Sequence, residues 1–226
     1  MDLEMLEFRS RTFNRIRAFF TGRGYLETDT PLLAPDLIPE TCLEVFETRS
    51  LPPRGSRSPA RPRYLIPSPE IWMKRLLARH RRSLFQICRC FRNGESTGRL
   101  HSPEFTMLEY YTVEADYRDS LSLTEELFAR LAGTAAEITG EAPAETPTPQ
   151  DPLLPPFERI TVAEAFARYA GFDLYAAAEG GRLEDEARRL GLEPASGLDT
   201  AALYDLIFIH AVEPRLPQDR VVALMD

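Results

Sequence analysis

The sequence predicts an α+β fold in which helices flank an antiparallel sheet. Residues 84–92 and 104–113 both have the alternating pattern of strands, and a polar loop joins them as in an antiparallel hairpin. Elsewhere, strand-like and helix-like segments interleave without the regular spacing of βαβ units. A chain of 226 residues is also long enough to bury a substantial hydrophobic core.

The N-terminal segment predicts a helix over residues 3–21. Apolar side chains recur at helical spacing from Leu6 to Phe20, and the arginines lie mostly off that stripe. Gly22 follows the last of these positions, where a helix commonly ends. A short extended piece comes next and is interrupted by Pro31.

The following segment predicts two strands on either side of a long exposed loop, and then a helix. Alternation indicates a strand over residues 42–48, and a second strand begins at Arg63. The Pro-, Arg- and Ser-rich residues 49–63 predict a solvated, disordered loop. Ser68 as N-cap and Pro69 at the first helical position predict the helix that precedes the hairpin.

The second half of the chain predicts mainly helices. Six prolines within residues 141–157 indicate an extended surface connection rather than a packed element. The other expected elements are helices over 119–139, 161–171, 182–191 and 199–216 and a final strand over 220–226.

Composition and charge restrict the classes of protein. No apolar run approaches the roughly 20 residues that span a bilayer, and the acidic N-terminus is unlike a signal peptide, so we expect a cytoplasmic protein with no membrane partner. Three cysteines, two of them Cys88 and Cys90, indicate reduced core or strand thiols and predict no metal site. Residues 48–94 hold twelve basic residues and one acid, a local net charge of +11 in a chain of −8, which suits a polyanionic ligand.

The second strand of the hairpin places candidate binding groups on one face. Residues of equal parity share a face, so Phe105, Glu109 and Tyr111 lie on the same side. At about 3.3 Å per residue, the ring of Phe105 and the carboxylate of Glu109 are roughly 13 Å apart. That spacing suits a ligand with a flat base at one end and a cation at the other. Parity alone leaves open a buried face in which Glu109 is paired internally.

The loop of the hairpin adds charged groups. Arg92 follows the first strand, where its guanidinium can hold a carboxylate or a phosphate through two hydrogen bonds. Arg99 and His101 lie on the return side of the loop, within reach of the outer phosphates of a nucleotide. Each alone has an ordinary structural explanation, such as a surface ion pair, but their gathering in one loop favours an anion-binding site.

Several motifs resemble the class II aminoacyl-tRNA synthetases, specifically the lysine branch. The stretch FRNGESTGRLHSPEFTMLEYY is similar to motif 2 of that family (about residues 84–113), and FFTGRGYLETDTPLL to motif 1 (about residues 8–33). SPEIWMKRLL and YDLIFIHAVEPRL also match the lysine-type catalytic domain. The resemblance implies a single class II catalytic domain over residues 1–226, a homodimer formed through motif 1, and ATP and Mg²⁺ as cofactors.

The resemblance assigns roles position by position. Arg92 would bind the α-phosphate and the amino-acid carboxylate and take the catalytic role, and Phe105 would stack on adenine. Glu70 would contact the α-amino group of lysine, and Glu109 and Tyr111 its side-chain ammonium. The expected ATP-binding residues of the loop are Glu95, Arg99 and His101. The loop departs from the family pattern by an extra residue, because it reads Arg-Asn-Gly-Glu.

Two further departures bear on activity. The motif 1 helix begins near residue 3, without the anticodon-binding barrel of a lysyl-tRNA synthetase, so the chain resembles the shorter ligases that attach lysine or β-lysine to a lysine of elongation factor P. The Gly-rich motif 3 is absent, so we expect a C-terminally incomplete domain, with most Mg²⁺ ligands outside this sequence. The alternatives are a lysyl-tRNA synthetase fragment that acts on lysine tRNA, and an inactive paralogue that only binds nucleotide or dimerises.

Overall fold

The computed structural model describes residues 2–36, 43–94, 98, 101–139 and 153–226. These residues form two compact units, residues 1–120 and 121–226. The predicted α+β class is confirmed, because helices accompany one antiparallel sheet and two sheets with other pairings. No helix in the described part of the chain is both long enough and apolar enough to cross a bilayer.

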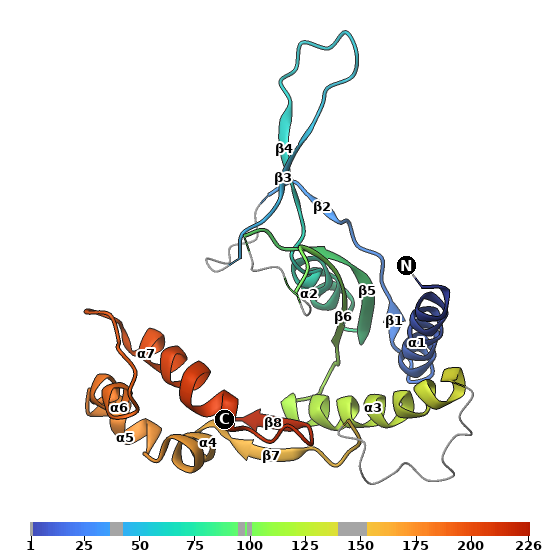
Figure 1. Cartoon of the computed structure of the whole chain (residues 1–226). Helices are drawn as coiled ribbons and strands as arrows, with labels where there is room; N and C mark the ends of the chain where they lie inside the picture. The colour runs from blue at the N-terminus through green and yellow to red at the C-terminus, as the bar shows by residue number, and fades with distance from the viewer. Residues whose placement is uncertain (1, 37–42, 95–97, 99–100, 140–152) are drawn as a thin grey trace. The chain divides into compact units, whose positions relative to one another are not determined.

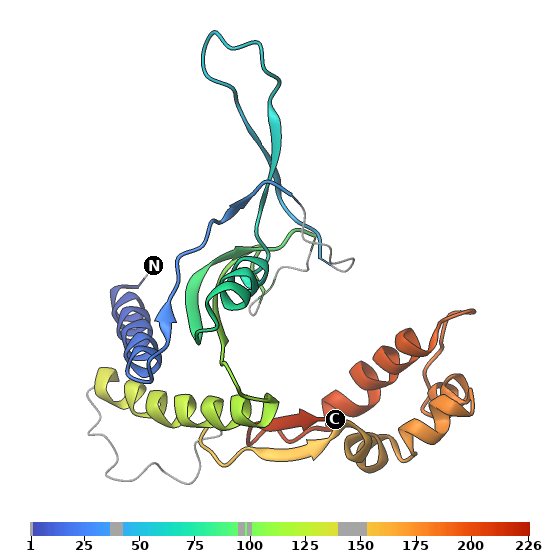
Figure 2. The same ribbon diagram turned by 180° about the vertical axis from the view of Figure 1, so that it is seen from behind.

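Two three-stranded sheets organise the first unit (Figures 1 and 2). One has the strand order β1-β5-β6, with β1 parallel to β5 and β5 antiparallel to β6. The other is antiparallel, with the order β2-β4-β3. The strands are β1 (Leu26–Glu27), β2 (Leu33–Ala34), β3 (Glu47–Ser50), β4 (Arg61–Leu65), β5 (Leu84–Phe91) and β6 (Glu104–Tyr111).

Helix α1 (Leu3–Thr21) has the bounds that the sequence predicts. The carboxylate of Asp2 caps its start by accepting a hydrogen bond from the Glu4 amide, and Gly22 follows its end. Its apolar stripe buries Ile16, Phe19 and Phe20. The helix therefore presents its last two turns to the core of the unit.

Phe20 is the centre of an aromatic cluster in the first unit. Its ring is fully buried, and its centroid lies 5.0 Å from that of Phe85 in β5 and 5.1 Å from that of Tyr110 in β6. Phe19 and Tyr25 contact the same ring edge-on at 5.2 and 5.1 Å. These contacts fix α1 against one face of the β5–β6 hairpin and leave the other face for the candidate site.

The helix before the hairpin begins one residue later than the sequence predicts. Helix α2 spans Glu70–His80, and Pro69 rather than Ser68 occupies the N-cap position without a side-chain cap. The Ser68 hydroxyl still accepts a hydrogen bond from the Glu70 amide, at 3.4 Å. The helix ends at Arg81, whose left-handed backbone allows its N–H to reach the Leu77 carbonyl.

The prediction of a disordered loop over residues 49–63 is wrong at both ends. Residues 49–50 belong to β3 and residues 61–63 to β4, and the two strands form an antiparallel ribbon. The strand predicted over 42–48 lies over Glu47–Ser50 instead. The backbone pairing of the two strands compensates for the absence of buried side chains, which the sequence pattern alone could not show.

The second unit combines a helical cluster with a two-stranded parallel sheet. Helix α3 (Tyr117–Thr139) leads into it. Strand β7 (Glu158–Thr161) pairs with β8 (Val222–Met225), so the predicted final strand has a partner that the sequence analysis did not identify. The intervening elements are α4 (Val162–Ala165), η1 (Phe166–Ala170), α5 (Leu174–Glu179), α6 (Leu183–Arg189), α7 (Thr200–Ile207), η2 (Phe208–Val212) and η3 (Glu213–Arg215).

Local capping explains where these short helices begin. Thr161 and Glu164 form a reciprocal capping box at the start of α4, and Asp173 and Asp199 cap α5 and α7. Buried side chains from α4, η1, α5, α6, α7 and η2 form one core cluster with Phe166, which is fully buried. The predicted Pro-rich connection lies mostly at residues 140–152, outside the described residues.

Replacing Phe20 with alanine tests the aromatic cluster. Truncation of a fully buried phenylalanine leaves a cavity, so we expect the free energy of unfolding of the first unit to fall by about 3–5 kcal/mol. Urea unfolding followed by tyrosine fluorescence measures the change. Ser10→Ala on the exposed surface of the same helix is the control, and we expect it to change stability by less than about 0.5 kcal/mol. Equal effects of the two substitutions would contradict this account of the core.

Candidate functional site

The register of β5 and β6 brings the candidate site together. Glu109 lies opposite Gln86, Met107 opposite Cys88, and Phe105 opposite Cys90. Directly opposed residues share a face, so these side chains line one side of the hairpin. The other side carries Phe85 and Tyr110, which pack on α1.

A carboxylate and a phenol form one end of this face. The Tyr111 hydroxyl donates a hydrogen bond to Glu109 Oε1 at 2.5 Å. Burial raises the pKa of the Tyr111 phenol, and the Glu109 and Glu70 carboxylates raise it further. The phenol therefore stays protonated at neutral pH and acts as a fixed donor to Glu109. The influence of Glu70 on Tyr111 also shows that α2 brings a second carboxylate to this end of the hairpin.

Glu70 has a partner within its own helix. It forms an ion pair with Lys74, one turn further along α2, and the lysine side chain is 57% exposed. Because exposed pairs at this spacing contribute only about 0.3–0.5 kcal/mol, a ligand ammonium can replace Lys74 at little cost. The pair orients Glu70 at the first position of the helix.

A guanidinium and an aromatic ring form the other end. Arg92 lies with its guanidinium carbon 5.3 Å from the centre of the Phe105 ring. The Arg92 amide donates to the Pro103 carbonyl at 3.0 Å, which holds the two sides of the loop together just beyond the strands. The structure thus places the two residues predicted for the base and the α-phosphate beside each other.

The loop beyond Arg92 uses a residue suited to its backbone. Gly94 has φ +73°, a conformation that side chains disfavour, and its amide donates to the Asn93 side chain. Glu95 and Arg99 lie outside the described residues. His101 is exposed on the return side, and in the described part of the chain its imidazole makes no hydrogen bond or ion pair. The predicted phosphate role of these three residues stays a prediction.

Two thiols occupy the middle of the face. Cys88 and Cys90 are both free, and their sulfur atoms are 3.8 Å apart. The hydrogen bond from the Cys90 thiol lowers the pKa of Cys88, and the same bond, together with burial, raises the pKa of Cys90. Cys88 is partly exposed and Cys90 is fully buried. The face therefore holds one reactive thiol between its two ends.

Sequence reasoning missed a polar group next to the thiols. Gln86 is 1% exposed, and its side-chain carbonyl accepts a hydrogen bond from the Thr28 hydroxyl at 3.0 Å. Asp29 is near enough to Cys88 to oppose the lowering of its pKa. The available signal was the polar run Thr28–Thr30 in the short extended piece after the first helix, but its position beside Gln86 depends on the pairing of β1 with β5, which the sequence analysis did not predict.

The donor set suits a nucleotide and an ammonium but offers no metal cage. An aromatic ring and a guanidinium fit adenine and a phosphate, and two carboxylates fit an amine. Among the residues that the structure describes, no three His, Cys, Asp or Glu side chains are grouped to hold a metal ion. Mg²⁺ would neutralise the phosphate charges of ATP, and the expectation that most of its ligands lie outside this sequence stays a prediction.

Comparison with known proteins identifies the class. A profile of the class II tRNA synthetases (D, K and N) matches residues 2–206, so the chain belongs to that family. The chain is similar to the elongation factor P–(R)-β-lysine ligases of Haemophilus ducreyi (33% identical over 218 residues) and Actinobacillus succinogenes (32% over 223 residues). It is also 34% identical over 222 residues to the lysine–tRNA ligase of Pelotomaculum thermopropionicum.

These matches cover nearly all of this chain but only part of each relative. They cover 96%, 99% and 97% of this chain but only 59%, 62% and 42% of the respective relatives. The chain therefore spans about three fifths of the length of the elongation factor P ligases that it matches. The predicted resemblance to the lysine branch is confirmed, and the relatives are ligases by name.

Thiol labelling tests the Cys88–Cys90 pair. At pH 7.5 we expect iodoacetamide to label Cys88 well before Cys90, because Cys88 has the lowered pKa and the greater exposure. Cys90→Ala removes the hydrogen-bond donor, so the pKa of Cys88 rises and its labelling slows by about three- to tenfold. Cys90→Ser is the matched control, because its hydroxyl still donates. Mass spectrometry of the digested protein gives the rates, and faster labelling of Cys88 in the alanine variant would contradict the assignment.

Proposed function

We propose that this chain carries the adenylating face of a ligase that activates lysine or β-lysine with ATP. One observation carries the proposal: the β5–β6 hairpin has the Glu109–Tyr111 pair at one end of a face and the Arg92–Phe105 pair at the other. The separation of about 13 Å between Phe105 and Glu109 suits a lysyl-adenylate, with its base and its ammonium at opposite ends.

Binding of the amino acid would depend on the carboxylates. Glu109 accepts a hydrogen bond from Tyr111, and a carboxylate has capacity for several, so it can also accept the side-chain ammonium of lysine. Glu70 would bind the α-amino group in exchange for Lys74. Because Tyr111 keeps its proton, its hydroxyl can hold the Glu109 carboxylate in position for the substrate.

The reaction would take place beside Arg92. The lysine carboxylate attacks the α-phosphate of ATP, a carboxylate–phosphate bond forms, and pyrophosphate leaves. Arg92 would bind both reacting groups and balance the charge on the α-phosphate, while Phe105 holds the adenine. Glu95, Arg99 and His101 would contact the outer phosphates. The bound ATP would bring Mg²⁺, which neutralises charge on the departing pyrophosphate.

A nucleophile of an acceptor, an amine on a protein or a ribose hydroxyl on a transfer RNA, would then attack the carbonyl of the adenylate and release AMP. The names of the similar ligases support a lysine of elongation factor P as acceptor. The similar lysine–tRNA ligase supports lysine tRNA as the second candidate. A cytoplasmic location and a homodimer formed through α1 complete the proposal, and the exposed Leu3, Met5 and Leu6 on α1 support such an interface.

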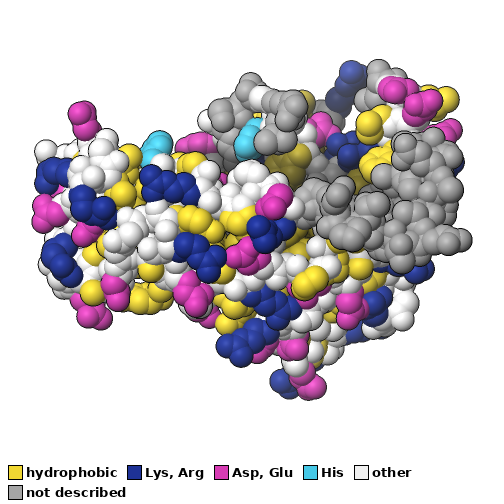
Figure 3. All heavy atoms as spheres, turned by 60° about the horizontal axis from the view of Figure 1, so that its bottom comes forward, with side chains coloured by type: hydrophobic (Ala, Val, Ile, Leu, Met, Phe, Trp, Pro, Cys, Tyr) yellow, Lys and Arg dark blue, Asp and Glu magenta, His cyan; other side chains and the backbone are white. Residues whose placement is uncertain are grey.

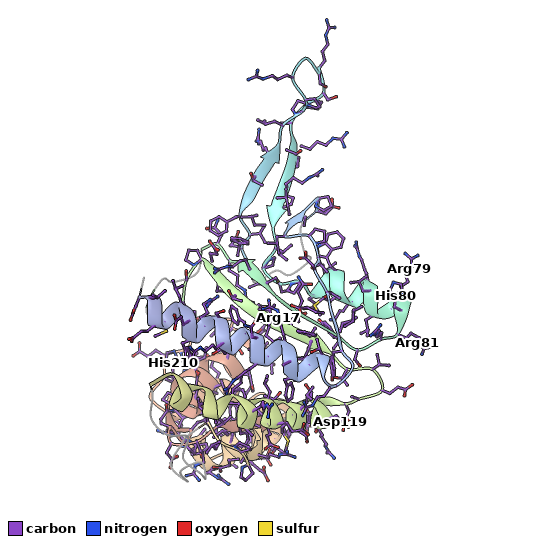
Figure 4. All side chains as sticks on the ribbon, turned by 90° about the vertical axis from the view of Figure 1, so that its right-hand side faces the viewer. Arg17, Arg79, His80, Arg81, Asp119 and His210 are labelled. Carbon is purple, nitrogen blue, oxygen red and sulfur yellow. The ribbon has the colours of Figure 1, made fainter. Side chains whose placement is uncertain are left out.

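Lysine-dependent ATP–pyrophosphate exchange is the experiment that tests the proposed chemistry. We expect exchange with lysine or β-lysine and none with alanine or aspartate as the added amino acid. Arg92→Ala should lower the rate at least about 100-fold, because the guanidinium is the charge partner of the α-phosphate. Arg79→Ala is the matched control, since Arg79 is an exposed arginine at the end of α2 (Figure 4). Exchange unchanged in Arg92→Ala would overturn the proposal.

Substitution of Glu109 tests which end of the face holds the ammonium. Glu109→Gln keeps the size of the side chain but removes its charge, so we expect the KM for lysine to rise about 10- to 100-fold while the KM for ATP changes little. The same exchange assay, run at varied lysine and varied ATP, separates the two constants. A larger effect on the KM for ATP would place the nucleotide, not lysine, beside Glu109.

A further inference from the structure

Residues 47–65 form a two-stranded ribbon, the β3–β4 part of the β2-β4-β3 sheet, that extends away from the β1-β5-β6 sheet (Figures 1 and 2). We call this segment the arginine arm. Its strands β3 and β4 are joined by residues 51–60, and almost every residue beyond the strands is exposed. No helix or strand of its unit covers either side of the ribbon in these views. A segment that buries so little apolar surface contributes little to the core.

The tip of the arm is a defined turn. The Ser56 amide donates to the Pro53 carbonyl at 3.0 Å, and Gly55 has φ +87°. This is the pattern of a type II turn, which requires a residue without a side chain at its third position. The turn places Arg54 at the outermost end of the arm, with Arg57 immediately after it.

Arginines line the arm from its tip to its base. The five are Arg49, Arg54, Arg57, Arg61 and Arg63. Arg61 and Arg63 share one face of β4, and Arg49 lies on the other face of the ribbon. With Glu47 as the one acid, the arm has a net charge of +4, so the rest of the chain has −12.

The arginines of the arm differ from those elsewhere in the molecule. In the part of the chain that the structure describes, none of the five has an ion pair, whereas Arg159, Arg168 and Arg188 of the second unit all do. On the face that Figure 3 shows, acidic and basic side chains are interspersed rather than gathered by sign. The arm is therefore a concentration of positive charge without ion pairs among the described residues, within the basic segment 48–94 of an acidic chain.

The base of the arm is tied to the candidate site by the backbone. The Phe91 amide donates to the Ile66 carbonyl and the Asn93 amide to the Glu44 carbonyl, each at 2.9 Å. These two bonds join the ends of the arm to the residues on either side of Arg92. A protein held by the arm is thus held next to the end of the face where the α-phosphate would lie.

We propose that the arginine arm binds an acidic surface on the protein that accepts the activated amino acid. The inference rests on the proposed function in that it takes a protein amine as the acceptor. Arginines on both faces and at the tip form hydrogen-bonded pairs with carboxylates, and the charge of the arm speeds encounter with an acidic partner. The rigid base then directs the acceptor lysine toward the adenylate.

The surroundings of the arm favour a protein over a nucleic acid. Outside residues 48–94, which hold most of the arm and carry +11, the chain carries −19, which repels an extended polyanion that must touch more than this region. Tyr64 at the base is the one aromatic residue of the arm, so residues 47–63 offer no surface on which bases can stack. An acidic patch on a folded protein can be met by the arm alone.

Binding of elongation factor P to the 226-residue chain tests the proposal without requiring turnover. The variant Arg54→Gln/Arg57→Gln removes two charges at the tip, and Arg79→Gln/Arg130→Gln removes two from exposed helical positions. Both variants have the same net charge. By isothermal titration calorimetry at 50 mM salt, we expect the tip variant to bind about tenfold more weakly and the control to bind as the unchanged chain does. At 300 mM salt the difference should shrink.

Three outcomes would overturn the proposal. They are absence of binding by the unchanged chain, equal weakening by the two variants, and loss of transfer RNA binding in the tip variant with elongation factor P binding retained. The exchange assay, run on the same samples, keeps this proposal separate from the proposed chemistry. Arm-dependent binding without lysine-dependent exchange would support the proposed role of the arm and refute the proposed adenylation. Exchange without arm-dependent binding would support the adenylation and refute the role of the arm.

Discussion

The register of the β5–β6 hairpin is the constraint on which the rest of the first unit depends. Because side chains alternate along a strand, a shift of one residue would exchange the two faces of the hairpin completely. In the observed register, Phe85 and Tyr110 face Phe20 of α1, and Gln86 and Glu109 face the opposite way. The packing of α1 therefore selects the register, and the register assembles the site. The register alone therefore brings together binding groups that are far apart in the sequence.

Different contacts hold the charged group at each end of the site, and the difference bears on which ligand group each end can bind. At one end, burial and neighbouring carboxylates keep the phenol of Tyr111 protonated, so that Glu109 is held by a donor that does not titrate near neutral pH. At the other end, Arg92 is held by its contact with an aromatic ring and by the backbone of its own loop. One end is thus suited to a fixed cation, and the other to phosphates whose charge changes during a reaction.

Much of the first unit could be predicted because its signals are local. Period-two alternation located β5 and β6, helical spacing located α1, and parity placed Phe105, Glu109 and Tyr111 on one face. The sequence predictions were wrong where hydrogen-bonded pairing between separate strands determines the structure. Residues 49–63 have the composition of a disordered loop, yet their ends are ordered by hydrogen bonds between two strands. Strand β7 was missed because its four residues show no period, and the approach of Asp29 to Cys88 depends on a parallel pairing that no local pattern encodes.

The arginine arm lies apart from the candidate site, so recognition of a partner by the arm can change without a change in the site. Its outer residues bury little, so insertions, deletions or changes of charge between residues 51 and 60 leave the core and the candidate site as they are. Under the proposed functions of the arm and of the site, selection can alter which macromolecule is recognised while the chemistry stays constant. In a family whose members serve both transfer RNA and a protein, such a segment is where divergence between acceptors can begin.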